Sequence, residues 1–277
     1  GSLVNILMDE RAGLAVVELN DAQRFNTIGS ALGDDLRSAV AWLSRRGNAL
    51  SAVSLQAAGP HFCPGGNPYA AKNRPESFDA FAASLSAPFS GAVQLRSLPC
   101  IVTAAVQGTL IGGGVAFALQ ADYVVAAADA TFEHGNLTRG VCPLGQFSQT
   151  FAHVLGSTVS TNAYLVNATL SAASAVAIGL VQEACTSTAA AQSRSRKVAE
   201  LLSSQPALAQ RLISMRLPIN AAAIDREAHG HAACLSTGAD ERPPTSSFAD
   251  RVDDLQLSLF GSVTPPAGEE EETSVLE

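Results

Sequence analysis

The sequence contains the stretch Val106-Gln-Gly-Thr-Leu-Ile-Gly-Gly-Gly-Val-Ala-Phe-Ala-Leu-Gln-Ala-Asp122. It predicts a buried strand that ends at Val106, then a glycine turn, then a helix. Three glycines let a ligand approach the backbone closely, and the free N–H groups at a helix start favour a negatively charged oxygen. The stretch lacks the Gly-Lys-Ser/Thr of a P-loop and the G-x-G-x-x-G of a dinucleotide site. It therefore indicates either a site for an oxyanion or tight packing of the helix against the strand.

A second glycine loop lies earlier in the chain, after a short apolar strand expected at 52–56. It reads His61-Phe62-Cys63-Pro64-Gly65-Gly66, and it also ends a strand with exposed glycine amides. Two such loops can converge on a single oxygen atom, which then accepts one hydrogen bond from each loop. We expect them to hold the carbonyl oxygen of an acyl group.

Apolar periodicity predicts strands that alternate with helices as far as about residue 195. The expected strands are 4–8, 14–19, 52–56, 100–106, 123–127 and 181–184, and the expected helices are 30–46, 78–98, 115–120, 148–155, 160–166 and 172–178. Each strand leads into a loop and then a helix, an order that is typical of an α/β fold.

The last part of the chain has a different pattern, which is helical at 193–203, 206–215 and 224–235. We therefore divide the chain into a core at 3–195, a helical region at 196–260 and a tail at 261–277. The tail contains two adjacent prolines and the acidic run Glu269–Glu272, a composition typical of linkers. It fits both a chain cut from a longer polypeptide and an ordinary disordered end.

Composition and charge argue against several classes of binding partner. The chain has 277 residues, of which 47 % are hydrophobic, and its net charge is −8 without a basic stripe, so nucleic acid is not expected as a partner. No apolar run reaches the roughly 18–20 residues that span a bilayer, and the start has no signal-peptide pattern. We expect a cytoplasmic protein. The five cysteines have no C-x-x-C spacing, which argues against a zinc site.

Four segments together suggest a family. Residues 20–28 read N-D-A-Q-R-F-N-T-I, residues 62–67 read F-C-P-G-G-N, residues 108–122 begin G-T-L-I-G-G-G and end A-D, and Phe132 precedes N-L-T-R-G-V-C-P-L-G at 136–145. In the same order, they resemble the N-R-P-x-x-x-N-A-L, F-(C/S)-A-G-x-D, G-x-A-x-G-G-G…C-D and F-x-x-P-E-x-x-x-G-x-x-P-x-x-G motifs of the crotonase (enoyl-CoA hydratase/isomerase) superfamily. The resemblance covers roughly residues 3–240.

The resemblance implies a ββα spiral core, followed by a C-terminal helical region that forms a homotrimer. It implies acyl thioester substrates, carried either by CoA or by the phosphopantetheine arm of an acyl carrier protein, with no other cofactor. The oxyanion donors carried over by position are the amides of Gly66 and Gly113, beside Gly65 and Gly112.

The departures from the family pattern bear directly on the reaction. Hydratases of this family use two glutamates to add water. The first glutamate position corresponds to Ala116 and the second to Asn136. Neither alanine nor asparagine can take a proton from carbon at neutral pH. Ordinary hydration of an enoyl thioester is therefore disfavoured.

Loss of both glutamates, with polar residues after the first loop and a late histidine, resembles one branch of the superfamily. This branch decarboxylates a 3-methylglutaconyl thioester on a carrier protein during β-branching of polyketides. The oxyanion hole would stabilise the dienolate that remains when CO₂ leaves. No strong base is needed, because the electrons come from the C–C bond that breaks.

The same resemblance implies roles for individual residues. Tyr69 and Lys72 follow the first loop as catalytic residues; Lys72 would hold the substrate carboxylate, and Arg74 competes with it for this role. Glu227-x-x-x-His231 resembles a pattern of that branch, so His231 is preferred over His229 as the group that protonates carbon. Asn136 and His134 are expected to contact the substrate.

Two alternatives stay open. One is another crotonase reaction on an acyl-CoA, by a hydratase, dehydratase, isomerase or cyclase that uses Glu133 or His134 as its base. The other is a thioester-binding homologue that has kept the fold and lost the acids together with catalysis.

Overall fold

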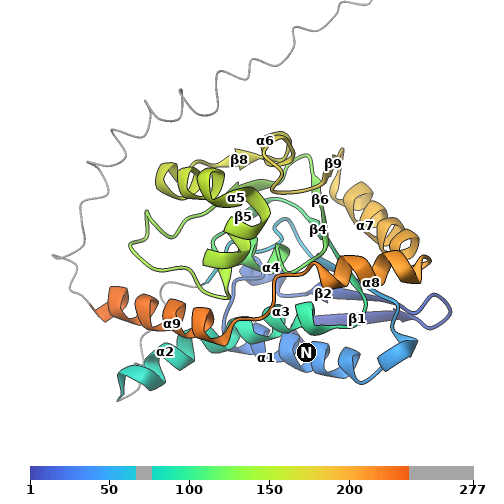
Figure 1. Ribbon diagram of the computed structural model, residues 1–277, viewed down its shortest axis with the longest axis horizontal. Helices are drawn as coiled ribbons and strands as arrows, with labels where there is room; N and C mark the ends of the chain where they lie inside the picture. The colour runs from blue at the N-terminus through green and yellow to red at the C-terminus, as the bar shows by residue number, and fades with distance from the viewer. Residues whose placement is uncertain (67–76, 237–277) are drawn as a thin grey trace, which may run out of the picture. The chain divides into compact units, whose positions relative to one another are not determined.

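The computed structural model describes residues 1–66 and 77–236, and a six-stranded sheet lies at the centre of this part of the chain (Figure 1). Its strands stand in the order β1 (Val4–Asp9), β2 (Leu14–Leu19), β3 (Ala52–Ala57), β4 (Ile101–Val106), β6 (Tyr123–Ala127) and β9 (Glu183–Cys185). β1 and β2 are antiparallel, and the pairs that follow are parallel. β3 and β4 are buried along their whole length, as expected for central parallel strands. The predicted α/β fold is confirmed.

A second, smaller sheet carries the triple-glycine loop. Its strands are β5 (Thr109–Ile111), β7 (Thr131–Glu133) and β8 (Leu170–Ser171), in that order. β5 runs parallel to β7 and leads directly into Gly112. The sequence did not predict these strands, because elements of two or three residues are too short to show an alternating pattern.

Helices pack on the central sheet and continue the chain beyond it. They are α1 (Ser30–Ser44), α4 (Gly113–Ala118), α5 (Phe147–Val166), α6 (Ala172–Ala177), α7 (Thr188–Ser203), α8 (Pro206–Ser214) and α9 (Ala221–Ser236). α7 packs against β3, β4 and β6. The domain boundary expected near residue 195 falls within α7, where the Ser195 hydroxyl lies 2.9 Å from the hydroxyls of Ser54 and Thr103. The residue at that boundary is therefore attached to the sheet.

The single helix expected at 78–98 was wrong. The segment forms α2 (Phe78–Ser86), a 3₁₀ turn at Ala87–Phe89, α3 (Ser90–Gln94) and a second 3₁₀ turn at Leu95–Ser97. Pro88 has no backbone N–H to donate, and its ring disfavours continuation of an α-helix. The break lets α3 pack closely on α1: a Cβ atom on Gly91 would lie 2.5 Å from the Arg37 nitrogen.

Two further predicted boundaries shift. The segments 148–155 and 160–166 form one element, α5, with a kink at Gly156, whose φ is 75°. The strand expected at 181–184 forms at Glu183–Cys185 as β9. No helix formed by residues 1–66 or 77–236 is long and apolar enough to span a bilayer.

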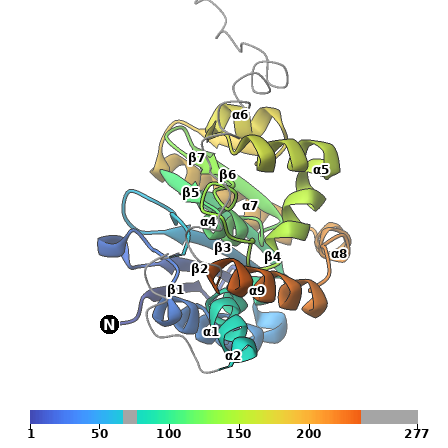
Figure 2. The same ribbon diagram turned by 90° about the vertical axis from the view of Figure 1, so that its left-hand side faces the viewer.

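α9 lies beside α2, as the two views of the molecule show (Figure 2). Its N-terminal half also reaches the start of α5, where the Glu227 carboxylate accepts hydrogen bonds from the Gln146 and Ser148 amides. α9 thus approaches the segment that follows β7, on which Asn136 and Cys142 lie.

Candidate active site

The first glycine loop follows β3 and is anchored to the strand and turn beside it. The Phe62 amide donates to the Gln107 carbonyl at 2.8 Å, and Cys63 forms an isolated parallel bridge with Leu110 of β5. Gly65 has φ 99°, which favours glycine, and its carbonyl accepts from the Ile28 amide at 2.8 Å. These contacts place the Gly66 amide on a well-supported backbone.

The second loop joins β5 to α4. Gly112 is the residue before the helix, with φ 49° and ψ −105°, and its amide donates to the Glu133 carbonyl at 3.0 Å. Gly113 is the first residue of α4, so its N–H has no partner within the helix and lies at the positive end of the helix dipole. No backbone hydrogen bond between the described residues takes its proton from Gly66 or Gly113.

The two loops are in direct contact. A Cβ atom on Gly65 would lie 2.6 Å from the Ile111 carbonyl oxygen and 3.7 Å from the Gly113 nitrogen. A Cβ on Gly114 would collide with the carbonyl oxygen of Cys63. A Cβ on Gly66, by contrast, would meet no atom within 4 Å, so this residue borders open space. The glycines therefore bring the first loop at Gly65 next to the Gly113 nitrogen.

Apolar side chains lie beside the Gly113 end of this pair. A Cβ atom on Gly113 would come within 2.7 Å of the Ile28 Cδ1 atom and within 2.9 Å of the Phe89 ring. Neither residue stood out in the sequence. Phe89 lies in the break between α2 and α3, so the continuous helix expected at 78–98 does not predict its position. These side chains therefore cover one side of the Gly113 backbone.

The two residues expected at the glutamate positions, Ala116 and Asn136, also lie beside the second loop. Ala116 is buried in α4. Asn136 is buried beside Gly112: a Cβ on that glycine would lie 3.4 Å from Asn136 Oδ1. Asn136 Nδ2 donates to the Cys142 carbonyl at 3.2 Å, while Oδ1 has no hydrogen-bond partner among the described residues. Asn136 thus presents an acceptor next to the second glycine loop.

His231 of α9 contacts the same carbonyl oxygen. Its Nδ1 atom lies 2.6 Å from the Cys142 oxygen, and because a carbonyl can only accept, Nδ1 carries the hydrogen. Nε2 is left to exchange a proton with a ligand. Burial lowers the pKa of His231, and the hydrogen bond to Cys142 opposes this shift in part. The structure therefore brings together Asn136 and His231, which are distant in sequence.

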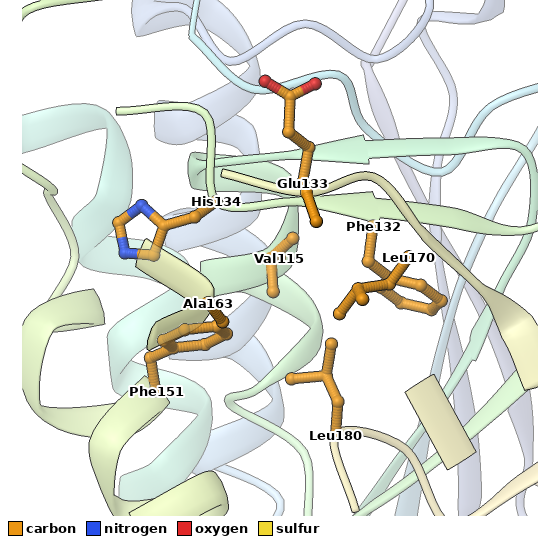
Figure 3. A pocket seen from close by; sticks show the side chains of 9 residues that line it. Val115, Phe132, Glu133, His134, Phe151, Ala163, Leu170 and Leu180 are labelled. Carbon is orange, nitrogen blue, oxygen red and sulfur yellow. The ribbon is translucent and has the colours of Figure 1, made fainter. Parts of the chain in front are cut away.

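The His134 ring lies among aromatic side chains. It stacks on Phe147 with centroids 4.6 Å apart and also contacts Phe151 and Tyr164. A cavity of about 10 Å³ lies beside it, among apolar side chains such as Val115 and Leu180 (Figure 3). Burial lowers the pKa of His134 to about 4, so the ring is neutral at neutral pH. The part of His134 that borders Gly112 is its carbonyl oxygen.

The side chains of Glu133 and His229 bind residues outside the two glycine loops. Glu133 Oε1 accepts from Arg139 at 3.1 Å and from Asn167 at 3.0 Å, and its carboxylate is directed away from the apolar cavity in Figure 3. His229 is partly exposed and pairs with Asp79 and with Asp225, contacts that raise its pKa. None of these side-chain contacts, all of them between described residues, involves a glycine loop or Cys142.

Three of the predicted residues lie outside the described part of the chain. These are Tyr69, Lys72 and Arg74, which fall in segment 67–76. Their roles stay predictions.

Comparison with known proteins identifies the family. The model of the enoyl-CoA hydratase/isomerase family matches residues 9–232, a range that includes both glycine loops, Asn136 and His231. The chain belongs to this family. It is a crotonase-type enzyme, as the motifs in its sequence indicated.

Two relatives of this crotonase share less than a third of their residues with it. The enoyl-CoA hydratase domain-containing protein 2 of Bos taurus is 27 % identical over 72 % of this chain and 68 % of the relative. A probable enoyl-CoA hydratase of Mycobacterium tuberculosis is 31 % identical over 65 % of this chain and 66 % of the relative. The matches thus span about two thirds of these relatives' own lengths.

Solved structures confirm the crotonase-type fold. An enoyl-CoA hydratase from Mycobacterium avium subsp. paratuberculosis superposes with a TM-score of 0.71 at 24 % identity, covering 90 % of this chain and 98 % of the other. At this level of identity the likeness concerns the fold alone.

Proposed function

We propose that this crotonase decarboxylates a 3-methylglutaconyl-type acyl thioester through an enolate held by the Gly66 and Gly113 amides. The carrier would be an acyl carrier protein or CoA. The observation that supports this most is the chemistry of the second loop: Ala116 and Asn136 stand where a hydratase needs two carboxylates, beside an intact pair of glycine loops. Stabilisation of an enolate is what such a pair can do without an acid.

The proposed step needs no base from the protein. The thioester oxygen accepts hydrogen bonds from the two amides, the C–C bond to the carboxylate breaks, and its electron pair moves into the dienolate as CO₂ leaves. His231 takes up a proton from solvent at Nε2 and delivers it to carbon, while the Nδ1 hydrogen remains bonded to the Cys142 carbonyl. Lys72, by resemblance, would hold the departing carboxylate.

A second candidate is hydration or dehydration of an acyl-CoA, because several relatives are named hydratases, among them a mevalonyl-CoA hydratase of Beauveria bassiana. For this chain the base would have to be Glu133 or His134. Glu133 is bound to Arg139 and Asn167, and the His134 ring lies among aromatic side chains. The local structure thus favours decarboxylation.

We also infer that this enzyme forms a homotrimer through its helical region. Leu201, Met215 and Ile219 are large apolar residues of the described part of that region, and they are exposed by 57 %, 71 % and 42 %. Contact with another subunit would bury these side chains.

The decisive experiment offers the protein two thioesters, 3-methylglutaconyl and a plain enoyl chain, each on CoA and on a carrier protein. Mass spectrometry is expected to show loss of CO₂ from the first and no gain of water by the second. His231→Gln should lower the decarboxylation rate about a hundredfold or more. Addition of water to the enoyl thioester, with the glutaconyl thioester unchanged, would instead establish the hydratase.

A further inference from the structure

One face of α9 carries His231 together with two other residues that contact the segment before and at the start of α5. Glu227, His231 and Cys234 lie four and three residues apart, a spacing that places them on one side of a helix. Glu227 meets the backbone at Gln146 and Ser148, and His231 meets the Cys142 carbonyl. Cys234 Sγ lies 3.9 Å from Cys142 Sγ. The face therefore docks on a single segment, 142–148.

Glu227 makes the strongest of these contacts. Its Oε2 accepts from the Gln146 amide at 2.7 Å, and its Oε1 accepts from the Ser148 amide at 2.8 Å and from the Ser148 hydroxyl at 2.6 Å. These are donors at the start of α5, where the helix dipole also favours a negative charge. The side chain is only 5 % exposed, so its hydrogen bonds are shielded from water.

Gln146 extends the same attachment to the chain that enters α9. Its side-chain oxygen accepts from the Asn220 amide at 3.0 Å, and its side-chain nitrogen donates to the Pro218 carbonyl at 2.8 Å. Gln146 is fully buried and has φ 61°. Both the start of α9 and its second turn are thus bound to the residues that open α5.

We propose that Glu227 is a positioning residue for His231: by binding the start of α5, it sets the rotation and depth of α9 and so places the imidazole at the Cys142 carbonyl. The proposal rests on the proposed function only in taking His231 as the proton donor. His231 follows Glu227 by one helical turn, and Cys142 precedes Gln146 by four residues. The two contacts therefore join the same pair of segments, and loss of the first displaces the second.

The chemistry of the contact requires a carboxylate. Three donors converge on two acceptor oxygens. In Glu227→Gln, the amide NH₂ group would face a backbone N–H, so one amide at the start of α5 would lose its acceptor. Glu227→Asp retains the charge but is one methylene shorter. It should therefore fold while drawing α9 inward.

The test measures decarboxylation kinetics of full-length Glu227→Gln, His231→Gln and the double variant. A displacement of about 1 Å can cost about a hundredfold, so we expect Glu227→Gln to lower kcat by about that factor with little change in KM. The double variant should be no slower than His231→Gln alone, because Glu227 acts through His231. Asp225→Asn, a neighbouring exposed carboxylate of α9, serves as the matched control and should retain kcat.

Two results would overturn the proposal. The first is a double variant slowed by the product of the two single effects, because it would make Glu227 independent of His231. The second is a folded Glu227→Gln with the kcat of the parent enzyme. If Glu227→Gln fails to fold, the same comparison is made with Glu227→Asp, for which we expect a loss of about tenfold.

A spectroscopic readout keeps the proposal testable if the proposed reaction fails. Nitrogen-15 NMR of the histidine rings, assigned through His231→Gln, should show the hydrogen of His231 on Nδ1 in the parent protein. In Glu227→Gln the signals should shift towards a mixture of the two tautomers. An unchanged Nδ1–H signal would contradict the positioning role. Full decarboxylase activity of His231→Gln would instead contradict only the proposed mechanism.

Discussion

A single carbonyl oxygen, that of Cys142, accepts hydrogen bonds from both Asn136 Nδ2 and His231 Nδ1. This fixes the orientation of two side chains whose ends are otherwise ambiguous, because only donors can face a carbonyl. Asn136 must then turn Oδ1 towards Gly112, and His231 must leave Nε2 as its exchangeable position. A main-chain atom thus determines which atoms of Asn136 and His231 are available to a ligand.

His134 allows a prediction about stability and pH. Its folded pKa is about 4, against an ordinary value of 6.5, so the unfolded chain binds the proton more readily between these limits. The free energy of unfolding should therefore fall as the pH drops through this range, by about 3 kcal/mol in total from this residue. His134→Phe, which retains an aromatic ring, should lack that part of the pH dependence.

The measurement is urea denaturation of parent and variant at several pH values between the two limits. Glu227, whose pKa is raised mainly by burial, acts in the opposite direction but is present in both proteins. Equal pH slopes for the two proteins would contradict the prediction.

At the scale of elements, the two glycine loops depend on close contact between backbones. The first loop bridges to β5 through Cys63 and Leu110, and the turn of α4 packs against the Cys63 carbonyl at Gly114. A side chain does not fit at this contact. Because glycine has none, the start of α4 can lie directly against the first loop. The same packing that forms the donor pair therefore also stabilises the core.

Gly114→Ala and Gly66→Ala are a matched pair of variants: the first lies at the close backbone contact, and the second borders open space. Alanine usually stabilises a helix relative to glycine, but at Gly114 its Cβ collides with a carbonyl, so we expect a loss of about 1–3 kcal/mol in the free energy of unfolding. Gly66→Ala meets open space and should change stability by less than about 0.5 kcal/mol. Urea denaturation checks both values. Equal destabilisation would rule out the contact as the cause.

At the scale of the whole described molecule, Arg216 binds the end of α8 to the sheet. Its guanidinium donates to both carboxylate oxygens of Asp122 at 2.6 Å and to the carbonyls of Arg96, Leu98 and Cys100. Both side chains of the ion pair are only 8 % exposed. The contact precedes α9 in the chain, so it sets where the polypeptide turns towards the candidate site.

Asp122→Asn should be strongly destabilising. It leaves the Arg216 charge buried without its partner, a change that typically costs about 3–5 kcal/mol. Asp34→Asn removes the partner of Arg37 in an exposed ion pair, in which the Asp34 side chain is 59 % exposed, and should have no measurable effect on stability. Denaturation of the two variants side by side tests the difference. A small effect at Asp122 would mean that the guanidinium finds sufficient acceptors among the three carbonyls.

The sequence by itself determined the α/β class, both glycine loops and the family, because these depend on local periodicity and on glycine at defined spacings. By resemblance it also predicts that Ala116 and Asn136 stand at the positions of the two glutamates. Segment 67–76 lies outside the described residues, so the roles of Tyr69, Lys72 and Arg74 remain predictions.

The tertiary structure alone decided how distant residues meet. The Pro88 break that presents Phe89, the short strands β5, β7 and β8, and the shared Cys142 carbonyl have no repeating pattern in the sequence. Glu227 reaches Ser148 across 79 residues, and His231 reaches Cys142 across 89. Local propensity acts over a few residues, whereas such contacts form only when packed elements bring separated segments together. For this reason family resemblance could point to His231, but only the packing of α9 on segment 142–148 placed its ring at the Cys142 carbonyl.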